Sequence, residues 1–365
     1  MARSITIAGA GLSGLATAVL LAGRGVPCVA YDRRRGGGGR FHGGWQVLEN
    51  GTTELDALRE LESLGLPLDF AVLPATRAVF LDGLGGTHEV GSSAPFAYFT
   101  VRGAGPGTLD DALRRRAASL GVELREGSAA PPDADVIATG PRQADGVARE
   151  IVFSSDLEDT VAVLFDPRVT PTGYAYLFCL GGHATFGVAL VRRVAGLKDA
   201  SREAWRRFRE RFGGFAVREP REGGQFMNFA LPRSLRDADG RWYVGEAAGV
   251  QDFLFGLGNR LALRSAALAA EGVAGSFDAA RFAATVRRPM RHSIAMRAAY
   301  ERMGRRAFAA TCRAASRRDF RELLIAAQRP NPLSLGLACA AALVWRERRV
   351  CRHAPTCGWC RRRES

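Results

Sequence analysis

The N-terminal segment constrains the fold more than any other part of the chain. An apolar run is followed by Gly9, Gly11 and Gly14, then by an apolar helical stretch and a second apolar run that ends at Asp32. In this pattern the first glycine permits a tight turn, the second lets the backbone approach a pyrophosphate, and the third lets the helix pack closely on the sheet. An acid about 20 residues further on can accept the ribose hydroxyls. The segment therefore predicts a strand–helix–strand unit that binds a dinucleotide.

The apolar stretch over 15–22 could also be the core of a secretory signal. The interposed glycines and the second strand with its acid argue against that interpretation. No apolar run reaches the ~18 to 20 residues that a spanning helix needs, and the nearest, 333–345, is too short. We therefore expect a cytoplasmic protein, with peripheral contact to the inner face of the membrane as an open alternative.

Positive charge is concentrated in the last quarter of the chain. The 365 residues carry a net charge of +14, and twenty arginines against five acidic residues lie from Arg281 onward. A chain of 365 residues is long enough to form two interleaved domains. The expected partners are a small apolar substrate and either an anionic membrane surface or an acidic carrier protein. Instead of contacting a membrane, the apolar helix expected at 333–345 could pack over the domain that binds the substrate. The chain has no recognisable nucleic-acid-binding module, which argues against a nucleic-acid partner.

A second glycine cluster closely follows the acid. It spans 36–39 and lies between an arginine run that starts at Arg33 and the next arginine, Arg40. Such a cluster is more typical of FAD sites than of NAD sites, because it lets the backbone pass near the remaining phosphate and the ribityl chain. A flexible basic loop is the alternative interpretation.

Three later segments extend this pattern. Residues 241–249 place a glycine, an acid and small residues after a strand, 136–140 form a short strand that ends in Ala-Thr-Gly, and Arg102 precedes an amphipathic helix. With the first motif, these segments resemble the glutathione-reductase-type FAD fold. In the second motif Glu246 stands where that fold usually has aspartate. The FAD contacts that the resemblance implies are Gly9, Gly11, Leu12, Ser13, Gly14, Asp32, Arg33, Gly39, Arg40, Arg102, Thr139, Gly140, Gly245, Glu246, Gly249, Gly256, Gly258 and Asn259.

The same resemblance implies the architecture. It is an α/β fold in which a Rossmann-like FAD-binding domain, a parallel sheet with helices, is interleaved with an antiparallel-sheet substrate domain and followed by a helical C-terminal region. The expected segments are 1–45, 101–150 and 235–280 for the FAD-binding domain, 46–100 and 151–234 for the substrate domain, 281–350 for the helical region and 351–365 for a tail rich in Cys, His and Arg.

Within this superfamily the chain resembles the geranylgeranyl-reductase-like branch, whose substrate strand reads Tyr-x-Trp-x-Phe-Pro. Here Tyr174, Tyr176 and Phe178 occupy the aromatic positions, tyrosine replacing the tryptophan, and Phe186 follows on the next strand. The resemblance implies a flavoprotein that reduces or desaturates C=C bonds of an isoprenoid-like or lipid metabolite, with NAD(P)H as a possible transient electron donor. We expect Tyr174 or Tyr176 to supply a proton and Phe178 and Phe186 to line the substrate pocket. The alternating pattern also fits an ordinary half-buried strand.

Other flavoprotein classes match less well. Tryptophan halogenases carry a Trp-x-Trp-x-Ile-Pro strand and a catalytic lysine after the first motif, and this chain has neither. Aromatic hydroxylases carry an Asp-Gly motif, of which 144–149 is a shortened form. Hydroxylation is therefore the alternative chemistry. A non-catalytic FAD-bound module that docks an acidic carrier or a membrane is the alternative from another class.

The tail contains four metal-ligand side chains within ten positions. They are Cys351, His353, Cys357 and Cys360, and the last two have the C-x-x-C spacing that presents both thiolates to one metal. Zinc is the simplest metal ion for this set of ligands. A redox dithiol, stabilised by the following arginines, and a basic tail with free thiols are the alternatives.

Overall fold

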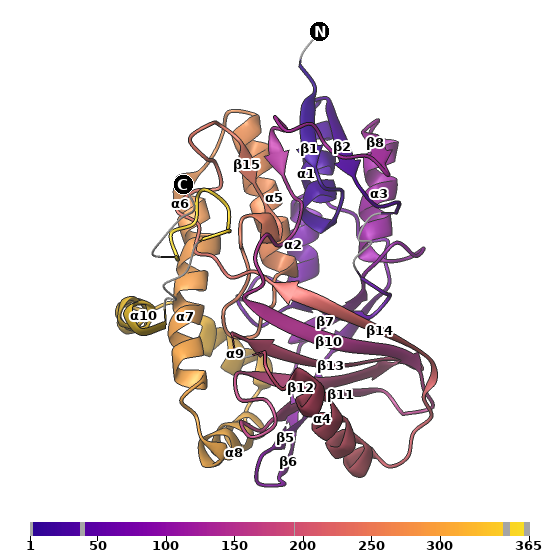
Figure 1. Ribbon diagram of the computed structural model, residues 1–365, viewed down its shortest axis with the longest axis vertical. Coiled ribbons are helices and arrows are strands. Elements are labelled where there is room, and N and C mark those ends of the chain that lie inside the picture. Colours follow the sequence, from indigo (N-terminus) through magenta and orange to yellow (C-terminus); the bar gives the residue numbers. More distant parts are fainter. Residues whose placement is uncertain (1–2, 37–40, 193, 346–350, 361–365) are drawn as a thin grey trace.

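The computed structural model describes residues 3–36, 41–192, 194–345 and 351–360, apart from the side chains of 342–345. The chain forms three sheets (Figure 1). The first is a five-stranded parallel sheet in the order β15-β9-β1-β2-β8. Its strands are β1 (Ile5–Ala8), β2 (Cys28–Asp32), β8 (Glu123–Glu126), β9 (Val136–Ile137) and β15 (Trp242–Tyr243).

Helix α1 packs on β1 and β2 of this parallel sheet. Helix α1 contacts both α3 and α5, and the side chains of its first ten residues are buried. Since nearly every position of α1 is apolar, the helix has no solvent face and lies in the core of the domain. The bounds are α1 (Leu12–Ala22), α3 (Leu109–Ser119) and α5 (Asn259–Val273).

The second sheet has seven strands in the order β14-β10-β13-β12-β11-β5-β6. All neighbours are antiparallel except β11 and β5. After β5 and β6 the chain returns to this sheet at Gly146, before the boundary at residue 150 that the sequence suggested. The strands are β5 (Arg77–Asp82), β6 (Thr87–Gly91), β10 (Gly146–Ser154), β11 (Thr160–Phe165), β12 (Gly173–Leu180), β13 (His183–Val191) and β14 (Arg218–Met227).

The strands of a small antiparallel sheet, β3-β7-β4, and a short helix alternate in the chain with strands of the two larger sheets. The helix begins at Ala57, because the Asp56 side chain accepts hydrogen bonds from the backbone N–H groups of Leu58 and Arg59 and so caps it. The leucine spacing over residues 54–64 by itself predicts a helix that starts at residue 54. The elements are β3 (Trp45–Glu49), α2 (Ala57–Ser63), β4 (Val72–Ala75) and β7 (Ala97–Val101).

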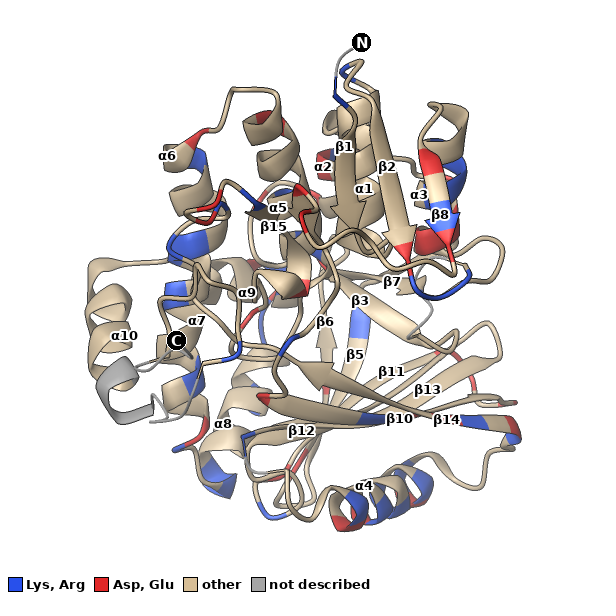
Figure 2. Ribbon diagram, turned by 45° about the horizontal axis from the view of Figure 1, so that its top comes forward, with Lys and Arg blue, Asp and Glu red and all other residues tan. Residues whose placement is uncertain are grey.

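Helices cover both faces of the seven-stranded sheet. Helix α4 (Leu197–Phe212) packs on β12 and β13, whereas α8 packs on β5 and β6 (Figure 1). Basic residues are spread along α4, α7 and α8 (Figure 2). The C-terminal elements are α6 (Ala279–Phe282), a π-helical turn (Ala283–Arg287), α7 (Arg288–Tyr300), α8 (Arg305–Ala315), α9 (Phe320–Gln328) and α10 (Pro332–Trp345).

Helix α10 packs against α7 rather than on the large sheet. Its Ala338 is buried, while Leu333 and Leu337 are mostly exposed. Within the described part of the chain, no helix combines the length and the apolar character that crossing a bilayer requires.

Candidate functional site

The first glycine motif forms the turn between β1 and α1. Gly9 has a φ of +105°, and a Cβ there would lie 2.4 Å from the Ala138 carbonyl oxygen. A Cβ on Gly14 would lie 1.8 Å from the Gly9 carbonyl oxygen, so only glycine allows this approach. At Gly11 a Cβ would meet nothing within 4 Å. Among the described residues no side chain caps α1, so its N-terminal N–H groups face open space that suits an anion.

Asp32 lies beside this turn at the end of β2. Its carboxylate accepts hydrogen bonds from the backbone N–H of Ala10 (3.0 Å) and of Arg34 (2.9 Å). Asp32 and Arg33 both line the cavity described below, as do Thr139 and Gly140 on the neighbouring strand end. The predicted contacts Gly39 and Arg40 lie outside the described residues.

The second glycine motif packs against the first. Gly245 has a φ of +58°, and a Cβ there would lie 2.5 Å from Ser13 Oγ. Gly249 approaches Ala230 in the same way, so Gly14, Gly245 and Gly249 permit close backbone packing and do not line the cavity. The cavity wall is formed by their neighbours Leu12, Ser13, Glu246, Gly256, Gly258 and Asn259.

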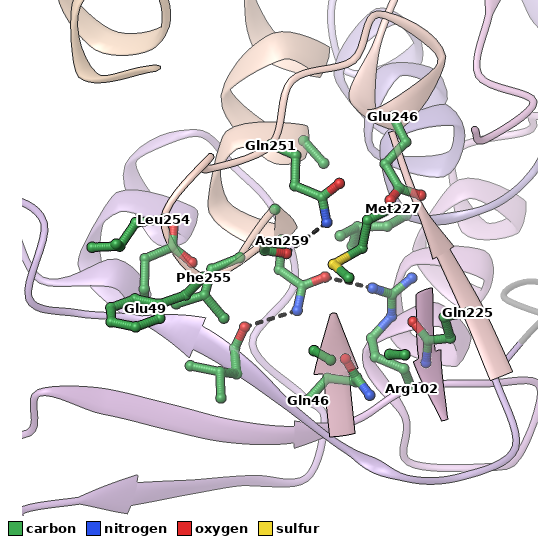
Figure 3. A pocket seen from close by; sticks show the side chains of 18 of the residues that line it. Gln46, Glu49, Arg102, Gln225, Met227, Glu246, Gln251, Leu254, Phe255 and Asn259 are labelled. Atoms are coloured by element: carbon green, nitrogen blue, oxygen red, sulfur yellow. Dashed lines mark hydrogen bonds between the residues drawn. The ribbon is translucent and has the colours of Figure 1, made fainter. Parts of the chain in front are cut away.

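A buried ion pair holds the middle of the site. Arg102 donates to Asp110 through Nε (2.6 Å) and Nη2 (2.8 Å), and its Nη1 donates to Asn259 Oδ1 (2.7 Å). Asn259 in turn donates to the Val47 carbonyl oxygen (Figure 3). Arg102 therefore ties the start of α5 to β3 and also faces the cavity.

One continuous cavity of 1510 Å³ joins these parts. It begins at the first glycine turn, passes Arg102 and the start of α5, and ends between the seven-stranded sheet and helices α7, α8 and α9. Ligand sites for single small molecules occupy roughly 300–1,000 Å³. The cavity therefore has room for a dinucleotide together with a second molecule.

The predicted aromatic residues divide between the two faces of the large sheet. Tyr174, Tyr176 and Phe178 line the cavity. Phe186 does not, and that prediction is wrong: its ring packs on Trp205 of α4 at 4.9 Å between centroids, in the core on the opposite face. Side chains alternate along a strand, so Phe186 of β13 points away from the cavity, whereas Gly187 lies against the Tyr176 ring.

The sequence reasoning missed a buried glutamate beside Tyr176. Glu150 of β10 accepts hydrogen bonds from Tyr176 Oη (2.5 Å), Gln46 Nε2 (3.0 Å) and Gln225 Nε2 (2.8 Å), and all four residues line the cavity. Burial raises the pKa of the Glu150 carboxyl, although these donors oppose the shift. Burial and the Glu150 carboxylate raise the pKa of Tyr176 well above its ordinary value. The sequence feature that points to Glu150 is a carboxylate at an inward-facing position of a strand whose side chains alternate between two faces.

A second buried glutamate faces the cavity from the end of β3. Glu49 lies near Leu254 and Phe255 (Figure 3), and among the described residues its Oε2 has no hydrogen-bond partner. Burial raises the pKa of this carboxyl to about 7, against the opposing charge of Arg260. A buried, unpartnered carboxyl oxygen is costly, so this atom is a candidate contact for a bound molecule.

We expect the wild-type apoprotein to lose stability relative to a Glu49→Gln variant as the pH rises from about 5 to about 8. The carboxyl pKa is about 7 in the folded state against an ordinary 4.5. Between these values the folded state binds the extra proton, so its free energy of unfolding falls as the pH rises. This pKa shift corresponds to a fall of about 3 kcal/mol in the free energy of unfolding of the wild-type protein. The glutamine variant has no carboxyl group at this position and should not show this fall. Denaturant titrations of both apoproteins at the two pH values measure it, and an identical pH dependence would contradict a buried, ionisable Glu49.

The four candidate metal ligands come together in the tail. The ligand atoms of Cys351, His353, Cys357 and Cys360 all lie within 4.8 Å of one another. The first three side chains are buried. This cluster lies apart from the cavity, since no residue of the described part of the tail, 351–360, lines it.

Comparison with solved structures identifies the fold. The chain is similar to a geranylgeranyl bacteriochlorophyll reductase-like protein from Thermoplasma acidophilum (TM-score 0.69, 15% identity, 92% of this chain and 95% of that chain). It is also similar to p-nitrophenol 4-monooxygenase from Pseudomonas putida (TM-score 0.62, 14% identity, 89% and 97%). A third match is CmlS, a flavin-dependent halogenase (TM-score 0.58, 18% identity, 94% and 77%). No family model matches the chain, and no curated protein matches it in sequence.

The chain thus has the fold of FAD-dependent oxidoreductases and monooxygenases, as its motifs predicted. Its parallel sheet, mixed seven-stranded sheet and C-terminal helices correspond to the glutathione-reductase-type FAD architecture. The residues present fit FAD: the turn at Gly11 is open, and both α1 and α5 begin at the cavity without a side-chain cap among the described residues.

Proposed function

We propose that this protein is an FAD-dependent oxidoreductase that reduces or desaturates C=C bonds of an apolar, isoprenoid-like or lipid metabolite. The observation that carries the proposal is the continuity of the cavity. The wall that begins with Gly11 and Asp32 extends past Arg102 to a chamber between the large sheet and the C-terminal helices. A dinucleotide at the glycine turns would then lie end to end with a molecule in the chamber.

The chamber is built for an apolar molecule. Its walls are mainly aromatic and aliphatic, and aromatic packing fixes them, with Phe165 stacked on Phe308 and Phe80 edge-on to Phe320. Each Å² of apolar ligand surface removed from water there contributes roughly 25 cal/mol to binding. The further apolar residues of the wall are Val161, Val163, Met296, Met303, Ala315, Leu323 and Leu324.

Bound FAD would supply or accept the hydride, as flavins do in C=C chemistry. Gly9, Gly11 and the start of α1 would hold the pyrophosphate, and Asp32 the ribose. By the family resemblance, Glu246 would face the ribityl chain, and Gly258 and Asn259 the flavin ring. Arg102 keeps Asn259 in place through the 2.7 Å hydrogen bond.

Tyr176 and Glu150 can handle the proton that accompanies hydride transfer. The high pKa keeps Tyr176 protonated at neutral pH. Its phenol can therefore protonate one carbon of the double bond when hydride is added to the other. In its protonated form, which burial favours, Glu150 is placed to return a proton to that phenol. Tyr174 donates instead to the Phe255 carbonyl oxygen (2.7 Å), a group that cannot return a proton to it.

The test is an anaerobic turnover experiment. We expect the purified protein to release FAD on denaturation, to be reduced by NAD(P)H or dithionite, and to be reoxidised by unsaturated isoprenoids of graded chain length. Mass spectrometry should find a product that has gained two hydrogens. A colourless protein that cannot be reconstituted with FAD would overturn the proposal.

Hydroxylation is the second candidate, because the aromatic wall also suits a ring substrate and p-nitrophenol 4-monooxygenase shares the fold. In that case the product contains oxygen from O₂, and substrate accelerates flavin reduction by NAD(P)H. If no donor reduces the flavin, a non-catalytic FAD-bound module is favoured. The arginine-rich C-terminal helices and the exposed Leu333 and Leu337 would then support docking to an acidic carrier or an anionic membrane.

A further inference from the structure

The tail cluster has the dimensions of a mononuclear metal centre. His353 Nδ1 lies 3.5 Å from Cys351 Sγ, 3.7 Å from Cys357 Sγ and 3.2 Å from Cys360 Sγ. In a tetrahedral site with Zn–S bonds of about 2.3 Å and a Zn–N bond of about 2.0 Å, the nitrogen–sulfur separation is about 3.5 Å. The three distances lie around this value, so one ion at the centre would reach all four ligands after small adjustments of their side chains.

The second ring nitrogen of the histidine is also positioned. His353 Nε2 lies 2.7 Å from Asp145 Oδ2, and both side chains are buried. A ligand histidine that donates its other N–H to a carboxylate is the usual outer shell of a zinc site, where the carboxylate fixes the tautomer and the ring orientation. Here it leaves Nδ1 free to ligate, and Nδ1 is the atom that faces the three thiols.

We propose that Cys351, His353, Cys357 and Cys360 bind one structural Zn²⁺ with Asp145 as the outer-shell carboxylate. Three thiolates and one imidazole in a closed tetrahedral arrangement favour zinc over the hard cations Mg²⁺ and Ca²⁺, which prefer oxygen ligands. In a two-iron cluster, ligands bound to different irons lie farther apart than ligands of a single ion. Here all four ligand atoms lie within 4.8 Å of one another. Four protein ligands leave no open position, so the ion is structural.

The metal would fasten the tail to the segment that follows β14. Gly358 N donates to the Leu231 carbonyl oxygen and Arg233 N donates to the Thr356 carbonyl oxygen, both at 2.9 Å. Asp145 also accepts a hydrogen bond from Phe229 N (2.6 Å). The outer-shell carboxylate thus belongs to the entry of β10, the strand that carries Glu150.

The tail also contacts the segment that follows the second glycine motif. Trp359, between the ligands Cys357 and Cys360, packs edge-on against Phe253 with 5.1 Å between ring centroids. Phe253 lies two positions after Gln251, which lines the cavity. Metal binding would therefore brace the wall of the cofactor site from outside without contributing to it.

Metal content of the full-length wild-type protein is the first test. Elemental analysis should find about one zinc per chain. After chelation and anaerobic addition of Co²⁺, absorption typical of tetrahedral thiolate-bound Co²⁺ should appear in the red, where oxidised flavin does not absorb. Zinc-free protein that also fails to take up Zn²⁺ or Co²⁺ when reduced would overturn the proposal, as would a Cys357–Cys360 disulfide in protein purified anaerobically. These readouts do not depend on enzyme activity, so they stand or fall separately from the proposed function.

Variants locate the site. Cys357→Ser should lose the zinc, whereas Cys339→Ser, the same change on exposed Cys339 of α10, should keep it. Asp145→Asn should retain zinc with 10- to 100-fold weaker affinity in competition with a chromophoric chelator. Amide hydrogen exchange at Arg233 and Gly358 of the wild-type protein should accelerate on chelation. Equal zinc content in the Cys357 and Cys339 variants would contradict the assignment.

Discussion

A Gly11→Leu variant is expected to fold normally and to lose FAD. The backbone of Gly11 has a φ of −87°, which any residue can adopt, and a Cβ there meets nothing within 4 Å. The leucine side chain would instead occupy the space at the start of α1 where the pyrophosphate is expected. Loss of two charge-assisted hydrogen bonds would cost about 3 kcal/mol, or about 100-fold in affinity. Titration of FAD into the apoprotein measures this, with circular dichroism as the check on folding.

Gly14→Ala is the matched control in the same motif. Its Cβ would lie 1.8 Å from the Gly9 carbonyl oxygen, so the helix must move away from the turn. We therefore expect this variant to lose stability as well as FAD. Undiminished FAD binding by Gly11→Leu would show that the pyrophosphate does not lie at this turn.

A Tyr176→Phe variant is expected to slow reoxidation of the reduced protein by its alkene substrate by about 100-fold or more, the contribution typical of a general acid. FAD binding and flavin reduction by NAD(P)H should be unchanged, because the ring and its stacking on Phe178 remain. Stopped-flow measurement of the two half-reactions separates these effects.

Tyr174→Phe is the control, since it removes a phenol from the same cavity whose hydrogen goes to a backbone carbonyl. We expect its rate to fall by less than about 10-fold, the loss of about one ordinary hydrogen bond. A large loss in Tyr174→Phe and none in Tyr176→Phe would reverse the roles of the two residues. No loss in either would place the proton source elsewhere.

Local motifs in this chain could be predicted because their geometry depends on neighbours in sequence. The turn at Gly9 needs a positive φ, and the approach of Gly14 to Gly9 follows from a strand that runs directly into a helix. The parallel sheet and its link to the second glycine motif follow from the same rules. The start of α2 was less predictable, since the Asp56 cap outweighed the leucine spacing.

The aromatic and acidic side chains of the chamber could be found only in part. Alternation predicts that residues of one strand divide between two faces, but it does not tell which face holds the ligand. Phe186 illustrates this, since its place under α4 depends on how β13 pairs with β10 and β12. Glu150 was overlooked because its partners Gln46 and Gln225 come from strands far away in the sequence.

The sequence by itself determined the glycine turns, the class of fold and the identity of four candidate metal-ligand side chains, because each depends on a short, ordered set of residues. The tertiary structure decided the rest. Pairing of distant strands brought Tyr176 to Glu150, and the return of the chain through α7, α8 and α9 closed the apolar chamber. The same return placed His353 against Asp145, a contact across 208 positions that requires the whole domain to fold.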